Sequence, residues 1–155
     1  MAEFEYEAPL HTVGIYLAVT DAKAAIAWYE KTFGAKVAST VPGPEGKLMH
    51  ADLRIGDSQV MLADIFSEGP FRDPRDSPPS LNLHVYVEDV DAVWERAIAA
   101  GATVVQPLAD QFWGDRFGMF RDPFGHTWAV AFKSKLSDAE LAKIRDEAMA
   151  QMGGA

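Results

Sequence analysis

The sequence has no cysteine among its 155 residues, which excludes disulfides, a thiolate nucleophile and a cysteine-ligated zinc site. It also has no apolar run near the roughly 18 residues that suggest a membrane span. Basic residues are few, since 14 Lys and Arg oppose 23 Asp and Glu and the formal charge is −9. Nucleic acid and anionic lipid are bound through basic patches. We therefore expect neither nucleic acid nor a membrane as a partner.

The N-terminal segment, MAEFEYEAPLH, lacks the basic-then-apolar order of a secretory signal. A cytoplasmic location is the default expectation, and the lack of cysteine fits a reducing compartment. The length predicts one domain over residues 1–155. Each half is too short to bury enough surface alone, so the halves are expected to share a core or to pair across a dimer.

One pattern occurs twice in the chain. VGIYLAVTDAKAAIAWYEKTFGAKVASTV, residues 13–41, has a counterpart in LNLHVYVEDVDAVWERAIAAGATVV, residues 81–105. In both copies an alternating apolar strand is followed by an acidic helix cap and a helix that stops at glycine, Gly34 or Gly101. A repeat of this length indicates a duplicated structural unit.

Each copy continues with further strands, and the order β-α-β-β-β is predicted twice. Gly56-Asp57 and Asp122-Pro123-Phe124-Gly125 are hairpin signals between the last two strands of each unit. Ser137 and Glu140 form a capping box before a helix with an apolar stripe, expected to pack on the body or on a partner subunit. The predicted organisation is a first module at about 12–66, a linker at 67–80, a second module at about 81–132 and a C-terminal helix at about 137–152.

Four segments together resemble the vicinal oxygen chelate superfamily, also called the glyoxalase/bleomycin resistance protein/dioxygenase superfamily, and its PhnB-like branch. The resemblance implies an α+β fold in which two βαβββ modules form a cleft lined by curved sheets, and a homodimer is expected. It is specific for fold and says little about reaction. The segments are TDAKAAIAWYEKTFGA (20–35), HADLRIGDSQVMLAD (50–64), LHVYVEDVDAVWERAIAAGA (83–102) and GDRFGMFRDPFGHTWAVAF (114–132).

Side-chain alternation predicts which residues face this cleft, because apolar residues of each strand must face the helix. With Leu17, Val60 and Leu83 on the helix side, the intervening positions point the other way. We expect the ligand to be bound by residues from both modules: His50, Asp52, Gln59, Met61, Asn82, His84, Tyr86 and Trp113.

Metal-dependent relatives carry ligands at four strand positions, which correspond here to Gly14, Met61, Asn82 and Ala129. None of these is a histidine or carboxylate, so no metal or other cofactor is expected at the standard site. The alternative is a displaced divalent-metal site built from His50 and His84 with Asp52 nearby. His126 is expected only to brace its turn.

Aromatic residues give the remaining signal. Phe112, Trp113, Phe117 and Phe120 cluster beside Arg116, and with Tyr16 and Tyr86 they are expected to wall a pocket. A sheet-end hydrophobic core explains the same cluster equally well.

The leading hypothesis is metal-independent binding of a small organic molecule, aromatic or cationic, with Asp52 and the acidic surface attracting a cation. The alternatives are a metal-dependent lyase, isomerase or dioxygenase using His50 and His84, and metal-free proton transfer with His84 as general base.

Overall fold

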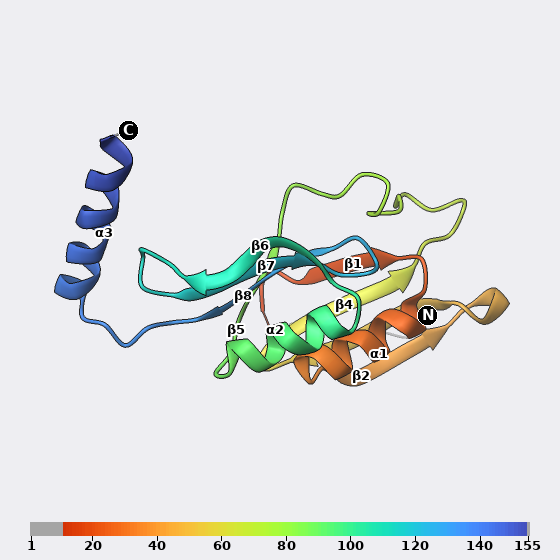
Figure 1. Cartoon of the computed structure of the whole chain (residues 1–155). Coiled ribbons are helices and arrows are strands. Elements are labelled where there is room, and N and C mark those ends of the chain that lie inside the picture. The colour runs from red at the N-terminus through yellow and green to blue at the C-terminus, as the bar shows by residue number, and fades with distance from the viewer. Residues whose placement is uncertain (1–10, 155) are drawn as a thin grey trace. The chain divides into compact units, whose positions relative to one another are not determined.

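The computed structural model describes residues 11–154, which divide into two compact units, one ending at Asp73 and the other beginning at Pro74. Each unit has one four-stranded sheet, and both sheets have the same topology (Figure 1). The first strand of each unit pairs in parallel with the fourth, and the remaining neighbours are antiparallel. The duplicated βαβββ order and the α+β class predicted from the sequence are confirmed.

Unit 1 has the strand order β1-β4-β3-β2. Its sheet carries one helix, and a short 3₁₀ turn, η1, separates β2 from β3. The elements are β1 (Ile15–Val19), α1 (Ala22–Phe33), β2 (Lys36–Pro42), η1 (Pro44–Gly46), β3 (Leu48–Ile55) and β4 (Ser58–Asp64).

Unit 2 repeats this arrangement with the order β5-β8-β7-β6 and adds a C-terminal helix. The predicted C-terminal helix, about 137–152, differs from the observed α3 by one residue at each end. The elements are β5 (Leu83–Tyr86), α2 (Val90–Ala99), β6 (Thr103–Asp110), β7 (Arg116–Arg121), β8 (Thr127–Phe132) and α3 (Asp138–Gly153).

The two sheet-covering helices begin with the same chemistry. The carboxylate of Asp21 accepts a hydrogen bond from the Ala24 amide, and that of Asp89 accepts one from the Ala92 amide, each at 3.0 Å. Both bonds satisfy an amide that has no partner within the helix. Gly34 ends α1 with a φ of 68°, a left-handed conformation that residues with a Cβ adopt only under strain.

Each sheet buries one face under its helix. Leu17, Val60 and Leu62 alternate toward α1 and are almost completely buried. In unit 2, Trp128 and Val130 of β8 are buried in the same way on the side that faces α2. This alternation leaves the intervening residues of every strand on the opposite, helix-free face.

Two buried carboxylates fix the ends of strands. Asp64, at the end of β4, accepts hydrogen bonds from the amides of Ala22 and Leu48 at 2.9 and 2.7 Å. Asp122 accepts from the amides of Phe124 and His126 and from Nε1 of Trp128, at 2.9, 3.0 and 2.8 Å. The carboxylate of Asp122 thus organises this turn together with the backbone of His126, while the bracing role expected of the His126 side chain stays a prediction.

Met49 departs from strict alternation along β3. Alternation would place Met49 on the same side as Ala51, but Met49 is 56% exposed and Leu48 is buried instead. The register of β2 against β3 shifts between Val41 and Pro42, and this irregularity rotates Met49 outward. Phe120 is fully buried against Trp94 with ring centroids 5.9 Å apart, which agrees for this residue with the hydrophobic-core explanation rather than with a pocket wall.

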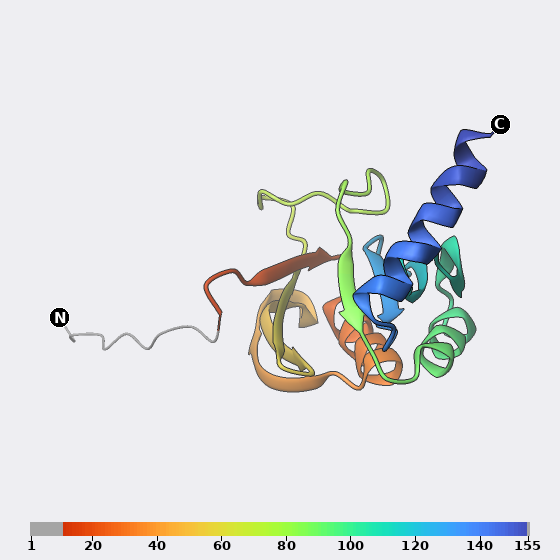
Figure 2. The same ribbon diagram turned by 90° about the vertical axis from the view of Figure 1, so that its left-hand side faces the viewer.

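The C-terminal helix α3 has the predicted capping box, in which Ser137 and Glu140 satisfy each other's backbone amides. It has no buried residue. Figure 1 shows α3 standing apart from the strands of its own unit, and in Figure 2 its C-terminal end extends beyond them. The expectation that this helix packs on the body or on a partner subunit stays a prediction, and its described contact with the body is that of Leu141 with Gly114.

Candidate functional site

The helix-free face of unit 1 is a continuous row of side chains across the sheet. Tyr16 of β1 pairs with Met61 of β4, and Met61 pairs with Asp52 of β3. His50 lies two residues before Asp52 and therefore shares its face. The sheet thus brings together, in one unit, four of the residues singled out in the sequence: His50, Asp52, Gln59 and Met61.

An imidazole and two aromatic rings meet on this face. The hydroxyl of Tyr16 lies 3.2 Å from Nδ1 of His50, and their ring centroids are 5.6 Å apart. Phe71 stacks on Tyr16 at 6.2 Å with an interplanar angle of 11°. Sequence reasoning missed Phe71, because it lies in the proline-rich segment after β4, where no periodicity indicates the direction of a side chain. Tyr16 and Phe71 remain 40% and 52% exposed and can cover a ligand.

Asp52 is already fully engaged by its neighbours. One carboxylate oxygen accepts from Nη1 of Arg54 at 2.5 Å, and the other accepts from Nε2 of Gln59 at 3.0 Å. The expected attraction of a cation by Asp52 stays a prediction, and Arg54 already compensates the charge of this carboxylate. Its two hydrogen bonds orient Arg54 and Gln59.

Met61 and Gly14 pack against each other where relatives carry metal ligands. A Cβ added to Gly14 would lie only 2.9 Å from Cε of Met61. The methionine side chain therefore occupies the space that a ligand side chain at position 14 needs. Asn82 and Ala129 complete the four positions and add only a neutral amide, so this donor set does not fit a divalent cation.

The helix-free face of unit 2 carries a longer series of rings. His84 lies 4.9 Å from Tyr86 and 5.6 Å from Phe117, measured between centroids, and its interplanar angle with Phe117 is 29°. Trp113 meets the edge of Phe117 at 5.6 Å and Phe112 at 5.0 Å. Tyr86 is 63% exposed and Trp113 is 39% exposed. These rings form a surface that a planar molecule can cover.

The two ring clusters occupy equivalent places in the duplicated units. His84 pairs with Ala129, and Ala129 pairs with Met119, just as Tyr16 pairs with Met61 and Met61 with Asp52. Met119 and Asp52 are thus equivalent positions. Phe117 and His50, which lie two residues before them, are therefore equivalent as well. Each unit therefore holds one imidazole and one aromatic ring at the same pair of positions, with the two residue types exchanged.

The described residues provide no conventional metal cluster. Within residues 11–154 no group of three or more His, Cys, Asp or Glu is arranged to hold a metal ion. Nδ1 of His50 is engaged by Tyr16, and both oxygens of Asp52 are engaged by Arg54 and Gln59. His84 is placed among rings of its own unit. Metal independence and the displaced His50/His84 site both stay predictions.

The sequence of the chain matches one known protein family. The chain belongs to the Glyoxalase/Bleomycin resistance protein/Dioxygenase superfamily, whose family model matches residues 9–130. The family expected from the four sequence segments is thereby confirmed. The described chain has no helix with the length and apolar character needed to cross a membrane.

Individual relatives span most of the chain. The uncharacterized protein Rv0887c of Mycobacterium tuberculosis is 47% identical over 119 residues, which cover 74% of this chain and 70% of that protein. TioX from a Micromonospora species superposes with a TM-score of 0.61 at 30% identity, covering 82% of this chain and 99% of TioX. The PhnB protein from Bacillus cereus superposes with a TM-score of 0.65 at 21% identity, covering 79% of this chain and 99% of PhnB, and this likeness concerns the fold alone.

Proposed function

We propose that this protein binds a small planar organic molecule on the helix-free faces of its sheets without using a metal ion. The observation that carries the proposal is the repeated imidazole–aromatic pair, Tyr16 with His50 and His84 with Phe117, at a centroid separation of 5.6 Å in both units. Exposed rings of this kind are costly to leave in water and favourable to cover with another ring. Membership of a superfamily that contains bleomycin resistance proteins supports a binding function.

The polar groups beside the rings define the ligand further. When the Tyr16 hydroxyl donates to Nδ1 of His50, Nε2 of His50 carries the proton and is the donor that remains for a ligand. A planar ligand with a carbonyl or other acceptor oxygen matches this donor. Because the ion pair with Arg54 compensates the charge of Asp52, and Gln59 donates to its other oxygen, the face of unit 1 favours an uncharged ligand over a cation.

Chemistry at the four family ligand positions supports metal independence. Gly14 and Ala129 have no donor atom, Asn82 has only an amide, and Cε of Met61 fills the space beside Gly14. We infer that the rings, not an ion, retain the ligand. A homodimer and a cytoplasmic location remain predictions of the same proposal.

The test is a binding titration with neutral bicyclic aromatics, namely 1-naphthol, coumarin and 1,4-naphthoquinone, against cyclohexanol as a non-aromatic control. Removing one ring with Phe117→Leu is expected to weaken binding roughly two- to tenfold, because a ring pair contributes about 0.5–1.5 kcal/mol beyond the area it buries. Val37→Ala, on the exposed strand β2, is the matched control and is expected to change nothing.

A second arm distinguishes binding protein from metalloenzyme. Protein purified without chelator is analysed for metal, and the titration is repeated after EDTA treatment. The proposal expects no stoichiometric metal and an unchanged affinity. Stoichiometric metal that disappears in His84→Ala, or binding that EDTA abolishes, overturns it and favours the metal-dependent alternative. Equal binding of cyclohexanol and the aromatics also overturns it.

A further inference from the structure

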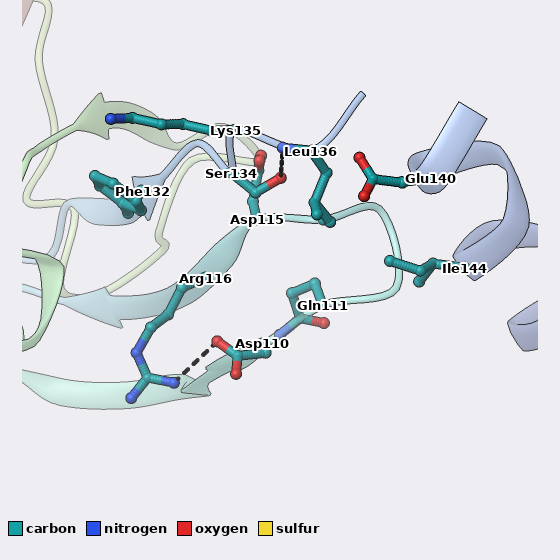
Figure 3. A pocket seen from close by; sticks show the side chains of 11 residues that line it. Asp110, Gln111, Asp115, Arg116, Phe132, Ser134, Lys135, Leu136, Glu140 and Ile144 are labelled. Atoms are coloured by element: carbon teal, nitrogen blue, oxygen red, sulfur yellow. Dashed lines mark hydrogen bonds and ion pairs between the residues drawn. The ribbon is translucent and has the colours of Figure 1, made fainter. Parts of the chain in front are cut away.

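Unit 2 has a cavity between its sheet and its C-terminal helix. Its volume is about 800 Å³. It is bounded by the connection between β6 and β7, by the segment that follows β8, and by the first turns of α3 (Figure 3). All of its lining residues belong to unit 2, so its geometry does not depend on unit 1.

This cavity is on the other face of the sheet from the ring cluster. Phe132 pairs with Arg116, one residue beyond the pair of Ala131 and Phe117. Alternation therefore directs Phe132 and Arg116 away from the face that holds Phe117. Arg116 agrees with this direction, because it reaches Asp91 on α2. An occupant of the cavity and a ligand on the ring cluster would not compete for the same side chains.

The wall of the cavity contains apolar side chains that are partly open to water. Phe132 and Leu136 are 38% and 39% exposed, and Ile144 of α3 lies across the cavity from Phe132. The helix is held there by Leu141, whose side chain occupies the space next to Gly114. An apolar body that lies against these side chains would remove part of their surface from water.

The charges around the cavity leave one carboxylate without a partner. Arg116 donates to Asp91 at 2.7 and 3.0 Å and to Asp110 at 3.2 Å, so its charge is compensated. Glu140 accepts hydrogen bonds from the amide and hydroxyl of Ser137, which orient this carboxylate but leave its negative charge in place. The half-buried carboxylate of Asp115 has no hydrogen bond or ion pair within residues 11–154.

The remaining cation near the cavity does not neutralise Asp115. The side chain of Lys135 extends away from Glu140 and Ile144 (Figure 3). A chain with a formal charge of −9 adds to the negative potential at this place. The cavity therefore combines an apolar wall with an uncompensated negative group, which is the complement of a small amphiphilic cation.

We propose that this cavity is a binding site for a small amphiphilic amine. The apolar body lies against Phe132, Leu136 and Ile144, and the ammonium group pairs with Asp115. A charge-assisted hydrogen bond favours an ammonium over a hydroxyl of the same size. The site is separate from the proposed ring-binding function, and either can be occupied without the other.

The experiment titrates the whole chain with 2-phenylethylamine, with 2-phenylethanol as the neutral analogue and 3-phenylpropanoate as the anionic one. Binding is followed by NMR of ¹³C-labelled isoleucine methyl groups, with Ile144 assigned from an Ile144→Val variant. The amine is expected to shift the Ile144 methyl and to leave Ile15 of unit 1 unchanged. Both analogues are expected to bind at least about tenfold more weakly, since hydrogen bonds to charged groups contribute about 1.5–3 kcal/mol.

Variants at Asp115 decide whether that carboxylate is the partner. Asp115→Asn is expected to weaken amine binding about tenfold, whereas Asp57→Asn, on the exposed hairpin turn of unit 1, leaves it unchanged. Asp115→Glu keeps the charge and restores part of the affinity. Equal affinity for the amine and the alcohol, an Ile144 methyl that does not respond, or an Asp115→Asn variant that is folded and binds normally each overturns the proposal. If Asp115→Asn does not fold, the relative affinities of the three ligands for the natural chain decide the question.

Discussion

Leu141 packs against Gly114, so that a Cβ on Gly114 would overlap Cδ2 of Leu141. Gly114 also has a φ of 96°, a conformation that strains any residue with a Cβ. Gly114 therefore both shapes the connection between β6 and β7 and leaves the space into which Leu141 of α3 packs. Because α3 has no buried residue, this contact is a principal attachment of the helix to its unit.

The first prediction concerns the attachment of α3. Gly114→Ala is expected to displace the helix, which would raise hydrogen exchange across α3 and speed proteolysis in the segment between β8 and α3. The sheet of unit 2 should remain protected. Gly34→Ala is the matched control, because Gly34 has a φ of 68° but no atom within 4 Å of an added Cβ. Equal effects of the two variants on α3 would show that strain alone, without overlap, explains the result.

The second prediction concerns the turn between β7 and β8. Asp122→Ala removes the acceptor for two backbone amides and for Nε1 of Trp128. At about 1 kcal/mol for each hydrogen bond, the free energy of unfolding is expected to fall by roughly 3 kcal/mol. Urea denaturation followed by tryptophan fluorescence measures the change. Asp57→Ala, at the corresponding hairpin of unit 1, removes one exposed contact with Ser58 and should cost less than about 0.5 kcal/mol.

The third prediction concerns acid and α3. The hydrogen bond from the Ser137 hydroxyl, followed by that from the Ser137 amide, lowers the pKa of Glu140. A carboxylate with a lower pKa in the folded state stabilises that state at pH values above its unfolded pKa, and this contribution disappears as pH falls through the folded pKa. The first turn of α3 is therefore expected to fray below about pH 4.5, the ordinary value for Glu.

Amide NMR of the 137–141 segment between about pH 6 and pH 3 tests this expectation, since that window spans the ordinary titration of Glu. Glu140→Gln retains an acceptor for the Ser137 amide but no longer titrates, so the pH dependence of this segment should be reduced. An unchanged pH profile in that variant would assign the fraying to other carboxylates.

The pKa of Asp91 is also lowered, because this carboxylate accepts a hydrogen bond from Arg116.

The fourth prediction concerns the ring pair of unit 1. Tyr16→Phe keeps the ring and its stacking with Phe71 but removes the hydroxyl that contacts His50. Ligands with a carbonyl acceptor are expected to lose affinity by about two- to tenfold, the range for one neutral hydrogen bond, while rings without an acceptor bind equally. The measurement compares coumarin with naphthalene. A loss for both ligands would indicate a packing defect rather than a lost hydrogen bond.

Patterns of period two and helix caps were sufficient to predict the order of strands and helices, and the family resemblance supplied the fold. The alternation in β1 and β4, the caps at Asp21 and Asp89 and the glycine stop at Gly34 are local features, and all are observed. Local features also contained an overlooked signal. Arg54 lies two residues after Asp52 on the same face, and Gln59 pairs with Arg54 across the predictable hairpin, so the engagement of Asp52 was accessible from the sequence.

Other parts of the sites depend on geometry that no local pattern encodes. Phe71 reaches Tyr16 from an irregular segment, and Met49 is rotated by an irregularity in strand pairing. The cavity of unit 2 depends on the direction in which α3 leaves β8 and on one contact, Leu141 with Gly114. A sequence that correctly predicts a capping box at Ser137 does not predict where the capped helix goes.

The exchange of residue types between the two ring pairs has a consequence for redesign. Since Tyr16 and His50 stand where His84 and Phe117 stand in unit 2, the double change Tyr16→His and His50→Phe would turn one face into a chemical copy of the other while conserving an imidazole and a ring. The same backbone framework would then carry the same pair twice. Each half of the molecule can in this way act as an internal reference for the other.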